Sequence, residues 1–237
     1  AACGATPQAF LLSLSLPLAD EAWLAGFSSG LFQLADQHGC ELIGGDTTQG
    51  PLNIAITVMG DTPKGQTILR SGAQVGDDLY VSGPLGDARL ALEAFRGSVS
   101  LPQGVFDLSR LRMECPTPRV ALGHALRGIA TAMADISDGL LGDLGHILKA
   151  SRVGAEIDTS IAPQLMQTGH LWSCPKDLCL TCVLSGGDDY ELVFSAPPSA
   201  SAQVQLAAEA SDTPITCIGH ITDSQCLVLL GGDGLPV

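Results

Sequence analysis

The chain has 237 residues, of which 46% are hydrophobic and 15% charged, so it is long and apolar enough to bury one large core or two small ones. Its formal net charge of −14 argues against nucleic acid or an anionic membrane surface as a partner, because both attract Lys and Arg. No apolar run approaches the ~20 residues of a membrane span, and no signal peptide is visible. An acidic chain can still bind a nucleotide when divalent metals lie between its carboxylates and the phosphates.

The eight cysteines are expected to be reduced thiols. The chain is too long and too apolar to need a disulfide framework, and no Cys-x-x-Cys pair is followed by a second at zinc spacing. Cys179 and Cys182 lie alone in an apolar run, where buried thiols are expected. We therefore expect a reducing, cytoplasmic location.

The first part of the chain predicts a helix among three strands. The expected strands are residues 10–16, 41–43 and 52–59. Asp20 is a suitable N-cap for a helix that runs to about His38, and Gly39 suits the position after its end. Residues 44–50 are expected to form a turn, and the Gly- and Pro-containing residues 60–65 mark a domain boundary. The predicted domains are therefore residues 1–65 and residues 66–237.

The second part alternates strands and helices. The expected strands are residues 78–83, 131–136, 155–157, 180–184, 191–195, 216–218 and 227–230. The expected helices are residues 87–95, 117–127, 140–148 and 202–210. A loop containing Pro102, Gly104 and Pro116 and an irregular segment at residues 159–178 separate them. Because no uniform strand–helix–strand period demands a parallel sheet, the predicted fold class is α+β.

The first motif that could carry chemistry is Gly44-Gly45-Asp46-Thr47-Thr48-Gln49-Gly50. Glycines at a strand end let backbone approach a ligand and adopt positive φ. An acid there can hold a metal, and hydroxyl and N–H groups can face phosphate oxygens. The alternative is a hairpin turn in which Asp46 makes a local bond to its own backbone.

The second motif, Asp135-Ile136-Ser137-Asp138-Gly139, joins a buried strand to a helix. A helix N-terminus attracts anions, so two carboxylates there are a poor anion site unless a cation is present. Magnesium would resolve the conflict, with Asp135 and Asp138 as ligands and Ser137 free to touch a phosphate. The alternative is that Ser137 or Asp138 is only an N-cap.

Two further motifs carry charge. Residues 186–191, Gly-Gly-Asp-Asp-Tyr-Glu, place three acids among four positions between strands, where like charges repel unless something positive binds. A solvated hairpin turn is the alternative. Arg70, beside Ser71-Gly72, could reach a phosphate or could be an ordinary surface arginine. No phosphate-binding loop of the G-x-x-x-x-G-K-[ST] type is present, so carboxylate-bound metal would have to replace its lysine.

These motifs, together with Leu69-Arg70-Ser71-Gly72-Ala73 and Pro116-Thr117-Pro118-Arg119, occur in the order found in bacterial thiamine-monophosphate kinases, which the chain resembles over nearly all its length. The family shares its fold with aminoimidazole ribonucleotide (AIR) synthetase, selenophosphate synthetase and a hydrogenase maturation factor. The resemblance implies two α/β domains of the AIR synthetase-like fold and a homodimer. It also implies transfer of the γ-phosphate of ATP to thiamine monophosphate, directly and with several Mg²⁺ ions.

The resemblance also implies site residues. Gly45, Asp46, Arg70 and Ser137 match ATP contacts; Asp46, Asp135 and Asp138 match magnesium ligands; Glu191 matches the acid that contacts thiamine. The family's N-terminal metal motif before Ala1 and its C-terminal tail after Val237 are not in this sequence. We therefore expect an incomplete N-terminal domain and a chain that does not turn over alone. The alternatives are another ATP-dependent enzyme of this fold, or a non-catalytic nucleotide-binding fragment.

Overall fold

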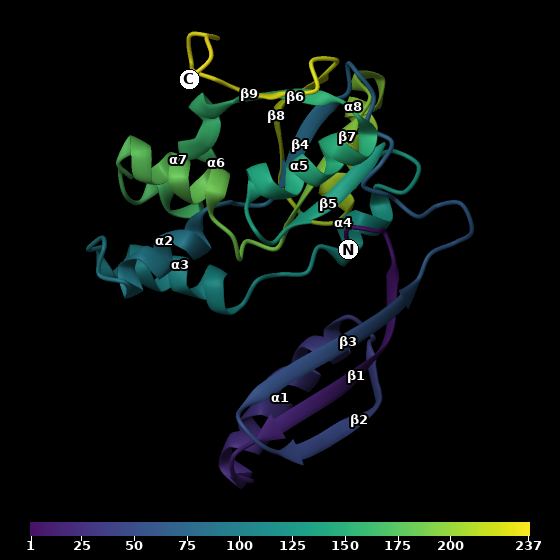
Figure 1. The fold of residues 1–237 in the computed structure, drawn as a ribbon, viewed down its shortest axis with the longest axis vertical. Helices are drawn as coiled ribbons and strands as arrows, with labels where there is room; N and C mark the ends of the chain where they lie inside the picture. The colour runs from purple at the N-terminus through teal and green to yellow at the C-terminus, as the bar shows by residue number, and fades with distance from the viewer. The chain divides into compact units, whose positions relative to one another are not determined.

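The computed structural model describes every residue from Ala1 to Val237. The chain forms two compact units, a smaller one of residues 5–65 and a larger one of residues 66–237 together with Ala1–Gly4. No helix in either unit is both long enough and apolar enough to pass through a membrane. Each unit has its own sheet and its own helices (Figure 1).

The smaller unit is a three-stranded sheet with one helix along a face (Figure 1). Its elements are β1 (Thr6–Leu16), α1 (Glu21–Gln37), β2 (Glu41–Gln49) and β3 (Asn53–Asp61). The strand order is β2-β1-β3, with β2 parallel and β3 antiparallel to β1. The predicted helix boundaries are confirmed: the Asp20 side chain accepts a hydrogen bond from the N–H of Trp23 at 3.0 Å, and Gly39 has φ +59°.

The turn predicted at residues 44–50 is wrong, because β2 continues through the Gly-Gly-Asp sequence to Gln49. Gly45 is required for strand pairing: with φ +145°, a Cβ there would overlap the carbonyl oxygen of Leu12 on β1. The chain bends only at residues 50 and 51, and the N–H of Gly50 still donates to the carbonyl of Leu16 at the end of β1 at 2.9 Å. The close approach that glycine permits here is therefore to the neighbouring strand.

The larger unit is built on a six-stranded sheet of order β5-β7-β4-β8-β6-β9. All its strand pairs are antiparallel except β6 with β9. The strands are β4 (Asp78–Ser82), β5 (Ala132–Ile136), β6 (Gly154–Asp158), β7 (Glu191–Ala196), β8 (Ile215–Thr222) and β9 (Leu227–Leu230). The α-helices are α2 (Asp87–Phe95), α3 (Gln103–Glu114), α4 (Val120–Ala125), α5 (Leu140–Ser151), α6 (Ala162–Leu165), α7 (Lys176–Ser185) and α8 (Ser201–Ala210). Short 3-10 helices are η1 (Thr159–Ile161), η2 (Gln167–His170) and η3 (Pro198–Ala200).

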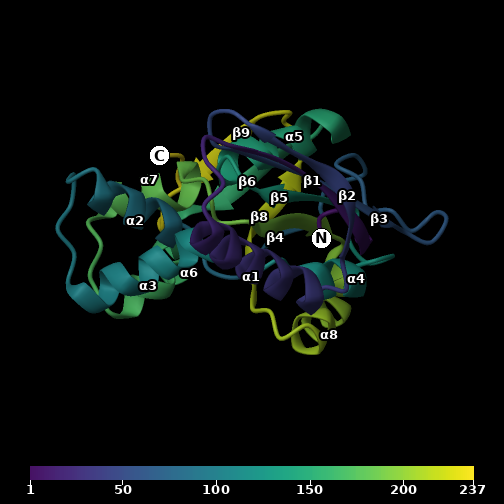
Figure 2. The ribbon, with the colours of Figure 1, turned by 90° about the horizontal axis from the view of Figure 1, so that it is seen from below.

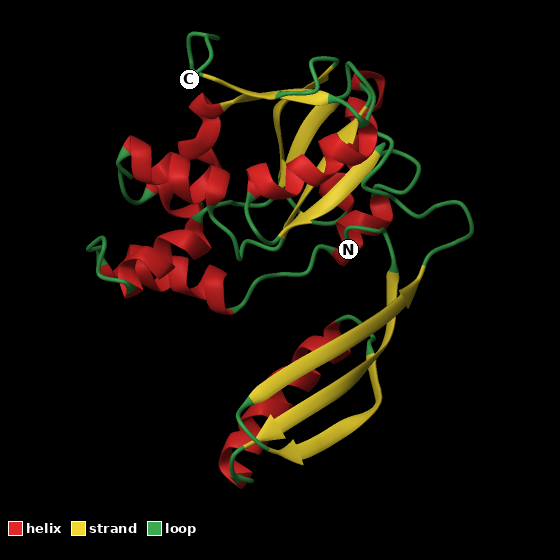
Figure 3. Cartoon of the chain, in the orientation of Figure 1, coloured by secondary structure: helices red, strands yellow, loops and turns green.

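Helices cover both faces of this sheet, as Figures 2 and 3 show, with α4 and α8 on one face and α5 and α7 on the other. Successive strand residues point to opposite faces, so β4 sends Leu79 and Val81 into the core beside α5 and α7. On the other face, Tyr80 stacks on Phe194 with ring centroids 5.2 Å apart. The larger unit is therefore a sheet buried between two helical layers, and the predicted α+β class is confirmed.

Three predictions for the larger unit are wrong. The segment predicted to be irregular at residues 159–178 contains η1, α6, η2 and the start of α7. Residues 180–184 belong to helix α7, whose Cys179, Cys182 and Val183 are buried. A short apolar run does not distinguish a buried strand from a buried helix. The loop predicted around Gly104 is helix α3, with Pro102 just before its first residue. Proline is favoured at helix starts, so Pro102 indicated the beginning of a helix where we expected a loop.

Candidate functional site

Two loops lie side by side at one end of β5 and β7 in the larger unit. Because β5 is antiparallel to β7, with Ile136 opposite Glu191, the chain leaves β5 where it enters β7. We call residues 135–139 and 186–190 the paired loops. The N–H of Asp188 donates to the carbonyl of Ser137, and the N–H of Tyr190 to that of Ile136, both at 2.9 Å. The motifs at residues 135–139 and 186–191, which are far apart in the sequence, are therefore brought together.

Glycines allow the paired loops to approach closely. A Cβ on Gly187 would lie 2.5 Å from the carbonyl oxygen of Ser137. Gly139 has φ +116°, and a Cβ there would meet the backbone of Ser185 at 3.0 Å. Gly187 and Gly139 thus allow one loop to lie directly against the other, and this placement brings the acidic side chains of both loops to the same edge of the sheet.

Three carboxylates of the paired loops influence one tyrosine hydroxyl, and one of them is bonded to it. Burial raises the pKa of Tyr190, and the hydrogen bond and charge of Asp188 and the charges of Asp135 and Asp138 raise it further. The Tyr190 hydroxyl donates to Asp188 at 3.2 Å. Asp138 and Asp188 are exposed and Asp135 is half-buried. The acids therefore gather at one edge of the sheet, where their mutual repulsion favours a bound cation.

The carboxylates of Asp135 and Asp138 are suited to Mg²⁺ when a bound ligand supplies further oxygen atoms. Neither Asp135 nor Asp138 has a hydrogen bond or ion pair to another side chain, so both carboxylates are available. No group of three or more His, Cys, Asp or Glu side chains is arranged to enclose a metal. Mg²⁺ commonly takes one or two carboxylates and completes its octahedron with waters and phosphate oxygens. The half-buried Ser137 lies between the two acids.

The N–H groups at the start of α5, which a helix N-terminus would otherwise offer to an anion, are already bonded within the chain. The N–H groups of Ser137 and Asp138 both donate to the carboxylate of Asp143, at 2.9 and 3.0 Å. Asp143 is buried in the first turns of α5 and satisfies these donors from within the chain. Any anion at this edge would therefore be held through a cation or through side chains.

The other predicted site residues lie elsewhere. Gly45 and Asp46 are on β2 of the smaller unit, where Asp46 is exposed and accepts the N–H of Thr47 at 2.9 Å. Arg70 is exposed beside the start of β5, since the N–H of Met133 donates to the carbonyl of Leu69 at 3.0 Å. Met133 is four residues along the strand from Ser137 in the paired loops, which corresponds to roughly 13 Å. Within the larger unit, Arg70 is therefore not beside the paired loops.

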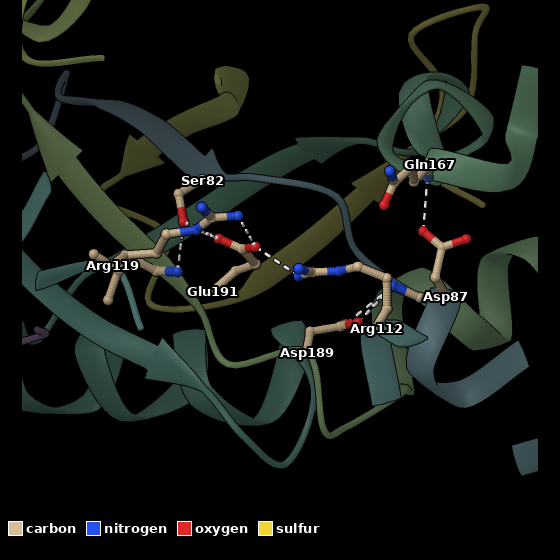
Figure 4. Close-up of polar contacts among 9 residues, drawn as sticks. Ser82, Asp87, Arg112, Arg119, Gln167, Asp189 and Glu191 are labelled. Carbon is tan, nitrogen blue, oxygen red and sulfur yellow. Dashed lines mark hydrogen bonds and ion pairs between the residues drawn. The ribbon is translucent and has the colours of Figure 1, made fainter. Parts of the chain in front are cut away.

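Glu191 has a different environment from its neighbours. Its side chain is completely buried and bonded to Arg112 at 2.8 Å, to Arg119 at 2.6 and 2.7 Å, and to the Ser82 hydroxyl at 2.7 Å (Figure 4). A Cβ on Gly83 would overlap the carboxylate, so glycine is required there. Neither Arg112 nor Arg119 was predicted from the sequence to have a role in the site. The only available signal was Arg119 at the end of the Pro-Thr-Pro-Arg motif.

Two further buried acids lie near Arg112. Both oxygens of Asp189 accept the N–H of Gly86 at 3.0 Å, and burial raises its pKa to about 8. Asp87 accepts two backbone N–H groups and the Thr168 hydroxyl from η2, and burial raises its pKa as well. Figure 4 shows the two acids on the Arg112 side of Glu191. Of the acids in residues 188–191, only Asp188 is exposed.

Two family models match this chain. Residues 1–62 match the family described as AIR synthase related protein, N-terminal domain, and residues 74–231 match its C-terminal domain. The chain is 41% identical over 239 residues to the thiamine-monophosphate kinase of Salmonella typhimurium and 40% identical to that of Escherichia coli K12. Each alignment covers 100% of this chain and 73% of the relative.

Solved structures show the same likeness. A thiamine-monophosphate kinase from Stenotrophomonas maltophilia is 43% identical with a TM-score of 0.90, covering 100% of this chain and 75% of that one. A structure described as AaThiL complexed with AMPPCP and TMP is 26% identical with a TM-score of 0.77, covering 100% of this chain and 73% of that one. A hydrogenase maturation protein HypE, 16% identical with a TM-score of 0.76 over 98% of this chain and 75% of that one, shares the fold.

Proposed function

This chain belongs to the thiamine-monophosphate kinase family and is a kinase, and from that premise we propose that it transfers the γ-phosphate of ATP to thiamine monophosphate. The products are thiamine diphosphate and ADP. The observation that carries the proposal is that the hydrogen-bonded paired loops bring the unpartnered carboxylates Asp135 and Asp138 to the same edge of the sheet as the exposed Asp188. A relative whose structure holds an ATP analogue and thiamine monophosphate supports the choice of substrates.

Asp135 and Asp138 are assigned to Mg²⁺, which when bound neutralises phosphate charge and orients the transferred group. Asp46 is assigned to Mg²⁺ and ATP, and Gly45 and Arg70 to ATP, by their match to the family motifs. The Ser137 hydroxyl, between the two acids, can donate to a phosphate oxygen. No activated nucleophile is needed, because the acceptor phosphate attacks the γ-phosphate directly and the enzyme contributes positioning and charge.

The burial of Glu191 changes the assignment of the acid that contacts thiamine. A carboxylate that is completely buried and bonded to two arginines and a serine has no face left for a substrate. Asp188 lies on the same loop, is exposed, and is oriented by the hydrogen bond from Tyr190. We therefore assign the contact with the cationic thiamine rings to Asp188, because a positive ring system is attracted to an ionised acid.

A homodimer is also part of the proposal. Ile54, Ile56 and Val58 recur at every second residue of β3 and remain 43%, 49% and 65% exposed. An alternating apolar row on an edge strand is suited to covering by a second copy. Sedimentation velocity tests this: we expect a dimer, and a shift to monomer when Ile56 is replaced by Lys.

The kinase assignment is tested by radiolabel transfer from [γ-³²P]ATP to thiamine monophosphate, with an aminoimidazole precursor as the competing acceptor. We expect label in thiamine diphosphate only, and a fall on the order of 100-fold for Asp138→Asn with a raised Mg²⁺ requirement. Asp223→Asn, at an exposed turn, is the matched control and should behave as wild type. Absence of transfer to thiamine monophosphate, or equal transfer to the competing acceptor, would exclude the assignment.

A further inference from the structure

The two arginines bonded to Glu191 are held in fixed positions. Arg119 binds it side-on, with Nε and Nη2 each donating to one carboxylate oxygen, and Arg112 donates through Nη2 alone. The Ser82 hydroxyl also donates to Glu191 and accepts the N–H of Leu192 at 2.8 Å. Glu191 is therefore anchored from three sides, and the planar guanidinium groups bonded to it lose most of their freedom.

Each guanidinium keeps N–H groups that the protein does not use. Nη1 of Arg119, and Nε and Nη1 of Arg112, form no hydrogen bond with protein atoms. The only buried side-chain nitrogen or oxygen without a partner in the chain is Oγ of Ser109. The unused N–H groups therefore reach solvent, which agrees with the 12% exposure of each arginine side chain. Two fixed cations with open donors are suited to an anion with several oxygens.

The place of the arginines favours the acceptor over ATP. Glu191 directly follows Tyr190 in the paired loops, and its neighbour Asp188 is the acid assigned to the thiamine rings. Arg119 begins the segment that leads into α4, and Arg112 lies in the last turn of α3. The triphosphate is assigned to metal-bound carboxylates, whereas a phosphomonoester approaching a chain of net charge −14 needs a positive site.

We propose that Arg112 and Arg119 bind the phosphomonoester group of the acceptor, and that Glu191 is a positioning residue that fixes both guanidinium groups. This site rests on the proposed function, and it explains why an acid is buried without any substrate contact. The arginines would hold the acceptor phosphate, whose oxygen attacks the γ-phosphate. The interaction is made by charge-assisted hydrogen bonds in a partly desolvated position, where they are strong.

The test compares Arg112→Lys, Arg119→Lys and the double variant Arg119→Gln/Glu191→Gln. The double variant removes one positive and one negative charge, so the net charge of the cluster of Arg112, Arg119 and Glu191 is unchanged. Arg110→Lys is the matched control, because Arg110 lies on the same helix and pairs with Glu114 at the surface. Kinetics give KM for thiamine monophosphate and for ATP, and calorimetry compares thiamine monophosphate, thiamine and inorganic phosphate as ligands.

We expect KM for thiamine monophosphate to rise about 10- to 100-fold in the three site variants, with KM for ATP and binding of unphosphorylated thiamine unchanged. Inorganic phosphate should bind wild type and Arg110→Lys and be lost from the site variants. Circular dichroism will show whether the site variants are folded. If folded variants keep the wild-type KM for thiamine monophosphate, the proposed phosphate site is overturned while the kinase assignment stands. Wild type without any transfer would overturn the kinase assignment, and the phosphate-binding comparison would then decide the site by itself.

Discussion

Replacing the buried Asp189 with Asn is expected to remove much of the pH dependence of the larger unit's stability. Burial raises the pKa of Asp189 to about 8 from 3.8; the charges of Asp87 and Glu191 raise it too, and the Gly86 N–H and Arg112 oppose them. Between those two values the unfolded chain releases a proton that the folded chain retains. The stabilisation of the folded state is therefore fully present below pH 3.8 and is lost as pH rises towards 8.

The size of the effect follows from the proton balance. One proton retained on folding lowers the free energy of unfolding by about 1.4 kcal/mol per pH unit, so wild type should lose up to about 3 kcal/mol between pH 5 and pH 7 through this group. Asn cannot ionise, and its Oδ1 can still accept the N–H of Gly86. The difference in stability between Asp189→Asn and wild type should therefore shift by that amount between the two pH values.

Urea denaturation monitored by tryptophan fluorescence measures this difference. Trp172 packs against the core of the larger unit, so a Trp23→Phe background makes the signal report that unit alone. Asp223→Asn serves as the control, because an exposed acid should leave the pH dependence unchanged. If Asp189→Asn and wild type differ by the same free energy at pH 5 and at pH 7, the reasoning is refuted.

Three other outcomes are expected. Gly187→Ala should abolish transfer activity, because its Cβ would lie 2.5 Å from a carbonyl oxygen of the neighbouring loop. Gly142→Ala is the control and should retain activity, because a Cβ there would have nothing within 4 Å. Equal activities of the two variants would contradict the packing of the paired loops. Phe194→Ala should lower the free energy of unfolding by about 3–5 kcal/mol in urea titrations, since the ring is fully buried, and a loss below ~1 kcal/mol would count against that packing. Burial raises the pKa of Cys182 to about 12, so mass spectrometry should find it unalkylated in the native chain at neutral pH while the exposed Cys226 reacts; similar rates would show that Cys182 is accessible.

Elements with local signals could be predicted closely. The α1 helix begins after Asp20 and ends before Gly39, because an N-cap side chain and a left-handed glycine act within a few residues of the helix end. Residues 44–50, by contrast, were predicted wrongly from local sequence. Their glycines suggested a turn, but the pairing of β2 with β1 extends the strand and requires Gly45 for close contact. The partner strand decides such cases, and it is not visible in local sequence.

The sequence by itself indicated the α+β class through its mixture of strand and helix patterns. The order of its acidic and glycine-containing motifs indicated the family by resemblance, and the kinase activity followed from that resemblance. Only the tertiary structure decided which acids face solvent. Asp188 and Glu191 are three positions apart, yet one is exposed and the other is enclosed by Arg112 and Arg119, which are 79 and 72 residues away in the chain. Burial of a charge depends on the long-range packing that supplies its partners, and that packing is a property of the assembled sheet and helices.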